Sequence, residues 1–93
     1  MQLNMVVKRR GKMEPFDEKK VYASIYAACM DCALGENRSE DISQEITSEV
    51  KIYVKDKKGI NTSEIFGFVL QKLARISEPA AFMYQTHREI PKV

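Results

Sequence analysis

Four cations lie in five consecutive positions near the start of the chain, in the stretch KRRGK at residues 8–12. Val6 and Val7 precede them and Phe16 follows. Lysine and arginine form charge-assisted hydrogen bonds to phosphate groups, and these are among the stronger hydrogen bonds in proteins. A basic tail would be poor in β-branched and aromatic residues, so this charge is predicted to belong to a folded element. The stretch indicates a local anion site.

Cys29 and Cys32 are the next residues whose spacing could serve chemistry. Zinc bound by four protein ligands needs a second pair of ligands, which the sequence lacks. Redox pairs with this spacing usually follow a strand, whereas these two cysteines lie inside an expected helix. His87 has no cysteine or histidine at a metal-binding spacing. We therefore expect free thiols and no metal site.

Size and charge limit what the whole chain can do. It has 93 residues, of which 44% are hydrophobic and 30% charged, and its net charge is +2. This predicts one domain over residues 1–93, with too little net charge for a general polyanion binder. The N-terminal order of apolar and basic residues does not suit a signal peptide, and no apolar run approaches the ~20 residues of a membrane span. We expect a cytoplasmic protein that does not enter membranes.

A hairpin is predicted to carry the N-terminal cations. Residues 4–9 read as a strand, Arg10 and Gly11 as a tight turn, and residues 12–16 as the returning strand. Pro15 cannot donate a ladder hydrogen bond, so the second strand should lie at an edge or end there. A short third strand is expected around residues 59–61.

Four helices are predicted to follow the hairpin. The first is capped by Asp17 and stopped by Gly35, and the second opens at Ser39 and is broken at residues 55–61. Asn61 is expected to cap the third, and the fourth runs from Glu78 to about residue 90. A hairpin followed by helices predicts an α+β fold, with a small sheet packed against about four helices.

The N-terminal residues resemble a family signature. Val7-Lys8-Arg9-x-Gly11, then Glu14-Pro15-Phe16-Asp17 and Lys20-Val21, are similar to the signature of the ATP-cone domain. That domain is the nucleotide-binding allosteric module at the N-terminus of many ribonucleotide reductases. The stretches GINTSEIFGFVLQKL and AAFMYQTHREI resemble its later helices, so the resemblance covers nearly the whole chain. The family often has Asp or Asn where this chain has Arg10.

The resemblance implies a regulatory, non-catalytic module that binds ATP or dATP, with magnesium carried by the nucleotide. It implies phosphate contacts from Lys8, Arg9 and Lys20, and from Thr62 at a helix start, where N–H groups favour an anion. It also implies an apolar wall for the adenine, formed by Val7, Val21 and Phe66. Glu14 and Asp17 are implied as hydrogen-bond acceptors for an amino group or a ribose hydroxyl. Strand alternation puts Lys8 and Arg9 on opposite faces of the hairpin. As contacts to phosphate, Arg9 and Lys20 are therefore ranked above Lys8.

A module without chemistry acts by favouring one conformation or assembly over another. The partners that the resemblance implies are a ribonucleotide reductase or another protein in trans, or further copies of the chain. Two other functions remain open. A nucleic-acid-binding module could use the hairpin cations with the lysines at 51, 55, 57 and 58, and its affinity would fall steeply with salt. An ATP hydrolase is disfavoured because the sequence has no Walker-type loop, so we expect no enzyme.

Overall fold

Helices make up most of the molecule. The computed structural model describes residues 5–7, 13–57 and 59–89. Its helices are α1 (Glu18–Asp31), α2 (Glu36–Lys55), α3 (Thr62–Ile76) and α4 (Glu78–Glu89). Its strands are β1 (Met5–Val7), β2 (Met13–Pro15) and β3 (Ile60–Asn61). None of the described helices combines the length and apolar character that crossing a bilayer requires.

The hydrophobic core lies between the helices, which pack their apolar faces against one another. As the 3.6-residue spacing predicts, α1, α2 and α3 each contribute one stripe of buried side chains, and α4 adds two neighbouring alanines. The buried apolar residues are Ile25, Ala28 and Cys29 of α1, Ile42, Ile46, Val50 and Val54 of α2, Ile65, Val69 and Leu73 of α3, and Ala80 and Ala81 of α4. β3 adds Ile60 to this cluster.

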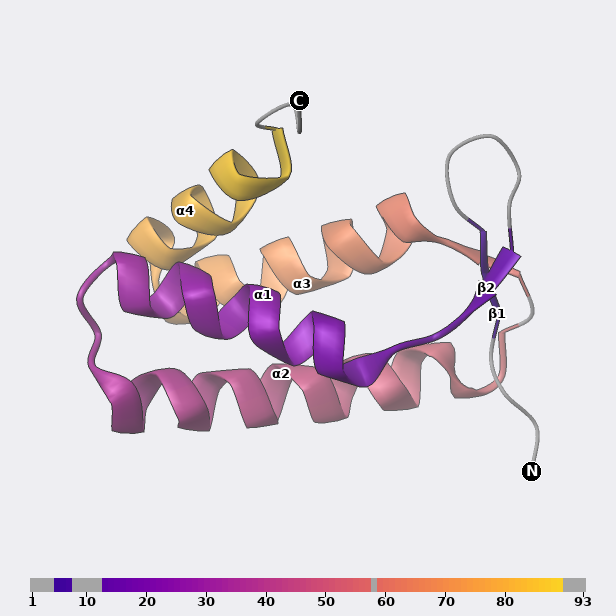
Figure 1. Cartoon of the computed structure of the whole chain (residues 1–93), viewed down its shortest axis with the longest axis horizontal. Coiled ribbons are helices and arrows are strands. Elements are labelled where there is room, and N and C mark those ends of the chain that lie inside the picture. The colour runs from indigo at the N-terminus through magenta and orange to yellow at the C-terminus, as the bar shows by residue number, and fades with distance from the viewer. Residues whose placement is uncertain (1–4, 8–12, 58, 90–93) are drawn as a thin grey trace.

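The three short strands pair in the order β2-β1-β3. β1 and β2 are antiparallel, with Met5 opposite Pro15 and Val7 opposite Met13. β1 and β3 are parallel, and Val7 lies opposite Asn61. Figure 1 shows these strands at the end of the molecule where α1 and α3 begin, beyond the body of the helices.

The predicted α+β class, with a sheet packed against the helices, is wrong. The helices are 14, 20, 15 and 12 residues long, whereas the strands have only three, three and two residues. Side chains alternate between the faces of a strand, so strands this short offer one or two residues to each face and cannot form an apolar layer. The helices instead bury one another, and the paired strands lie at their end (Figure 1).

The predicted caps of α1 and α3 are confirmed. Asp17 Oδ1 accepts hydrogen bonds from the backbone N–H groups of Lys19 (3.0 Å) and Lys20 (3.4 Å), which satisfies two donors at the start of α1. Asn61 accepts one from the N–H of Ser63 at 2.8 Å and so caps α3. These two side chains fix where the helices nearest the sheet begin.

The turn between α1 and α2 differs from its prediction. α1 ends at Asp31, and Gly35, with a φ of 85°, directly precedes α2 without a side-chain cap. α2 therefore begins at Glu36 instead of Ser39, because the positive φ of the glycine already reverses the chain. Ser39 lies fully buried inside the helix.

Candidate functional site

The strand pairing brings the end of β1 next to the start of α3. β1 and β3 are parallel, so both leave the sheet at the same edge, and Val7 lies opposite Asn61. Thr62 follows Asn61 directly as the first residue of α3 and is half-buried. Lys8 and Arg9 follow Val7 in sequence but lie outside the described residues, as does Arg10.

The start of α1 lies close to the other end of the same strand. Pro15 is opposite Met5, and Phe16 and Asp17 lead from there into α1. A strand rises about 3.3 Å per residue, so the two ends of β1 are only about 7 Å apart along its axis. Figure 1 shows that α1 and α3 both begin at the sheet. The positive ends of two helix dipoles therefore lie at one end of the molecule.

Asp17 and Lys20 present opposite charges in the first turn of α1, and both are exposed. One carboxylate oxygen of Asp17 accepts the two capping hydrogen bonds, so this helix start already has a negative group against its N–H donors. Asp17 therefore acts as the cap of α1 in this structure.

The two described residues predicted to face a base have packing roles as well. Val21 is half-buried and packs against the core. The ring of Phe66 stacks on Tyr84 of α4, with centroids 5.2 Å apart and planes inclined by 15°. Phe66 lies one turn after Thr62, so the two residues share a side of α3. Glu14 lies opposite Val6 in β2, and only its backbone and that of Val7 are described.

The cysteines are free thiols, as expected. Burial, with smaller effects from the neighbouring Cys32 and, in the opposite sense, Arg38, raises the pKa of Cys29 to about 11. The Cys32 thiol donates a hydrogen bond to the carbonyl oxygen of Cys29 at 3.3 Å. Among the residues that the structure describes, no three His, Cys, Asp or Glu side chains are grouped so that they could hold a metal ion.

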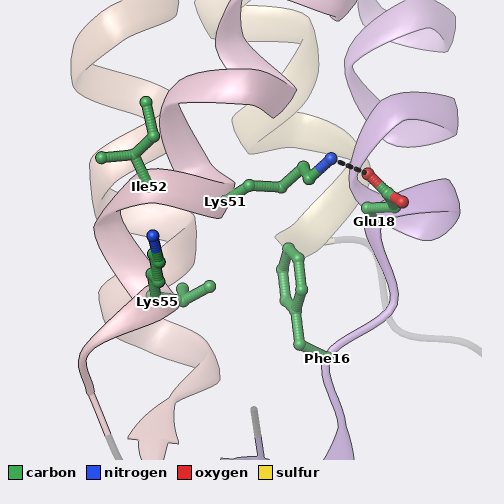
Figure 2. A pocket seen from close by; sticks show the side chains of 6 residues that line it. Phe16, Glu18, Lys51, Ile52 and Lys55 are labelled. Carbon is green, nitrogen blue, oxygen red and sulfur yellow. Dashed lines mark ion pairs between the residues drawn. The ribbon is translucent and has the colours of Figure 1, made fainter. Parts of the chain in front are cut away.

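A pocket of about 370 Å³ lies between the start of α1 and the last turns of α2 (Figure 2). Its lining residues are Phe16, Glu18, Lys51, Ile52, Val54 and Lys55, and none of these was predicted to contact nucleotide. Lys51 and Lys55 were predicted only as cations of a surface that could bind nucleic acid. The one signal that could have revealed the pocket is Ile52, an apolar residue off the buried stripe of its helix.

Comparison with known proteins places these features in a family. The sequence profile of the ATP cone domain matches residues 4–89. The transcriptional repressor NrdR of Synechococcus sp. (strain JA-3-3Ab) is 33% identical over 76 residues, which is 82% of this chain and 37% of the repressor. The NrdR of Picosynechococcus sp. (strain ATCC 27264 / PCC 7002 / PR-6) is 35% identical over 75 residues, 81% of this chain and 40% of the repressor.

The NrdR of Carboxydothermus hydrogenoformans (strain ATCC BAA-161 / DSM 6008 / Z-2901) is 27% identical over 90 residues, 92% of this chain and 57% of the repressor. The chain thus spans between 37% and 57% of the length of these three relatives. The profile match extends from before β1 to the last residue of α4, and so includes the strands, all four helices and the predicted nucleotide residues. This chain belongs to the ATP-cone family, whose domains are nucleotide-sensing regulatory modules.

Proposed function

We propose that this chain binds ATP or dATP as a regulatory ligand and performs no chemistry on it. The observation that carries the proposal is the family match over residues 4–89, because ATP-cone domains bind adenine nucleotides. The position of α1 and α3 supports it. Both helices begin at the sheet (Figure 1). α3 starts behind the uncharged cap Asn61, so its dipole favours an anion, while α1 contributes the exposed Lys20.

In the proposed complex the phosphates lie between the first turn of α1 and the start of α3. Lys20 and Thr62 contact them from these helices, and Lys8 and Arg9 contact them from the segment that follows β1. The adenine packs against Val7, Val21 and Phe66, while Glu14 and Asp17 accept hydrogen bonds from the amino group or the ribose. Magnesium arrives with the nucleotide. The support is the register of β1 and β3, which sets Val7 opposite Asn61 and so beside Thr62.

The nucleotide acts by drawing separate elements together. α1 and α3 both contact α4, so a movement of either helix reaches it. Phe66 stacks on Tyr84 in one contact, and His87 Nε2 lies 2.7 Å from Asp31 Oδ2 in the other. We infer that occupancy changes the surface that α4 presents near Met83, Tyr84 and His87. That change alters self-association or docking to a partner such as a ribonucleotide reductase.

Calorimetric titration with ATP, dATP and GTP tests the binding site. Lys20→Ala should weaken adenine-nucleotide affinity by about tenfold or more, because a charged contact to phosphate contributes roughly 1.5–3 kcal/mol. Lys19→Ala is the matched control, since Lys19 is an exposed lysine of the same turn that is not in the proposed site. Arg9→Ala should weaken binding in the same way as Lys20→Ala.

Circular dichroism of each variant separates lost binding from lost folding. Equal losses in Lys19→Ala and Lys20→Ala would reveal a diffuse charge effect and contradict the site. Unchanged affinity in both Lys20→Ala and Arg9→Ala would remove the proposed phosphate contacts. Sedimentation without ligand, with ATP and with dATP tests the mechanism, which predicts a ligand-dependent change in assembly alone or with a reductase.

Nucleic-acid binding is the alternative, and it is favoured by the relatives being transcriptional repressors. Lys51 and Lys55 in the last turns of α2, with Lys57 just after it, would follow the phosphate backbone. Such binding loses affinity steeply as salt rises and does not discriminate adenine from guanine nucleotides. A nucleotide site keeps a saturable preference for the adenine base under the same conditions.

A further inference from the structure

The pocket between α1 and α2 has an apolar floor and a basic rim. The half-buried Phe16 and the buried Val54 form the floor, and the exposed Ile52 lines the pocket from α2. Figure 2 shows the Phe16 ring pointing toward the gap that Lys51 crosses from α2 to reach Glu18 of α1. The volume of about 370 Å³ is near the lower end of the roughly 300–1,000 Å³ typical of ligand pockets.

Ile52 is a large apolar residue that lies exposed outside the core. Its relative exposure is 73%, whereas the other large hydrophobic residues exposed in the described part of the chain are Phe82 at 67% and Met30 at 37%. It does not belong to the core cluster, to which its neighbour Val54 does belong. A single exposed apolar side chain is ordinary, but this one borders a pocket with an apolar floor.

The charges around the pocket are mostly positive. Two lysines of α2, Lys51 and Lys55, line the pocket. Glu18 is the one carboxylate among the lining residues, and its oxygen lies 3.1 Å from Lys51 Nζ. A partner suited to these groups carries an apolar side chain next to carboxylates.

We propose that this pocket docks an acidic segment of a partner protein, with one large apolar side chain seated on Phe16 and Ile52. The carboxylates that flank this anchor pair with Lys55 and Lys51. The proposal goes beyond nucleotide binding, since none of the six lining residues belongs to the proposed nucleotide site. It gives a regulatory module a surface through which a second protein is recognised.

Glu18 occupies in the free chain the place that a partner carboxylate takes in the complex. Both members of the Glu18–Lys51 pair are about half exposed, at 52% and 56%, so the pair is weak and exchanges readily. Docking therefore replaces one carboxylate on Lys51 by another. This predicts that removal of the Glu18 charge strengthens docking.

The test uses the full chain and the synthetic peptide EDEFED, blocked at both ends, followed by amide chemical shifts. We expect saturable shifts at Phe16, Ile52 and Lys55. Lys55→Ala and Ile52→Ser should each weaken binding by about fivefold or more, and Glu18→Gln should strengthen it. Two comparison peptides replace the phenylalanine by serine or all acidic residues by lysine, and both should bind more weakly.

Matched variants elsewhere distinguish docking from general attraction. Arg38→Ala removes one positive charge at the other end of α2, and Phe82→Ser removes an exposed apolar side chain on α4, so neither should alter binding. The proposal is overturned if EDEFED gives no saturable shifts, if the lysine peptide binds equally well, or if Arg38→Ala weakens binding as much as Lys55→Ala. Shifts of the same amides on raising the concentration of the chain alone would identify a second copy as occupant and also overturn it.

Discussion

Ser43→Ala should stabilise the protein, because α2 buries the Ser43 hydroxyl group, which has no hydrogen-bond partner among the described residues. The side-chain oxygens of Ser39, Ser43 and Thr47 are all buried, and none finds a partner within the described part of the chain. The three residues recur every four positions on the buried face of α2, and Ser43 is 0% exposed. Polar atoms in such a place are usually paired, so these hydroxyls carry a cost in folding free energy.

The size of the effect follows from three contributions. A buried, unpaired hydroxyl costs about 1–3 kcal/mol, which the alanine variant recovers. Alanine also favours a helix more than serine does, by up to about 0.5 kcal/mol. Loss of one packed oxygen atom removes van der Waals contacts of about 0.1–0.2 kcal/mol each, which offsets part of this gain. We expect Ser43→Ala to raise the free energy of unfolding by about 1–2 kcal/mol.

Urea unfolding followed by circular dichroism measures this gain. With a slope of about 1–3 kcal/mol per molar urea, the midpoint should rise by roughly 1 M. Ser48→Ala is the matched control, because Ser48 is an exposed serine of the same helix and its replacement changes helix propensity alone. If Ser43→Ala gains no more than Ser48→Ala, or destabilises the chain, the Ser43 hydroxyl has a partner and the reasoning fails.

Three further predictions concern single residues. Iodoacetamide at pH 8 should modify Cys32 before Cys29 in peptide mapping, because the raised pKa of Cys29 leaves less of its reactive thiolate. The free energy of unfolding should fall between about pH 9 and 11, because the Cys29 thiol loses its proton near pH 9 in the unfolded chain and keeps it to about pH 11 in the folded one. Cys29→Ala should lessen that fall. Gly67→Ala should add about 0.5–1 kcal/mol to the unfolding free energy, since an added Cβ meets no described atom within 4 Å. Asp17→Ala should lower it by about 0.5–2 kcal/mol through loss of the α1 cap, measured as a lower urea midpoint.

The helices could be predicted from the sequence because the spacing of apolar residues and the capping residues indicate the same segments. The stripe of Ile65, Val69 and Leu73 and the Asn61 cap both identify α3, and the structure has both. The start of α2 was missed because Ser39 is a favourable capping residue by type, whereas Gly35 had already turned the chain. Side-chain preference alone could not reveal which of the two residues ends the turn.

The fold class was missed for a different reason. Strand patterns indicate where the backbone is extended, but not how long each strand is. The area that a sheet can bury depends on strand length, and for strands this short one or two residues decide whether the sheet can form a layer. The prediction of a nucleotide site rested on the family signature rather than on periodicity, and two of its residues, Lys8 and Arg9, lie outside the described residues. The position of Ile52 off the buried stripe of α2 is a signal of an unusual surface, but the pocket itself could not be predicted, since it depends on how the start of α1 meets the end of α2.

α2 links the stability of the fold to the proposed site. It packs against α1, which carries Lys20, and against α3, which carries Thr62. Its buried face combines the apolar residues that form the core with the three unpaired hydroxyls. The helices that would close on a nucleotide therefore rest on a surface that holds them less firmly than an all-apolar face would. If the proposed closure depends on this weaker hold of α2 on its neighbours, Ser43→Ala should raise the free energy of unfolding and reduce the proposed nucleotide-dependent change in assembly. A gain in stability at the cost of movement is a common result of such substitutions.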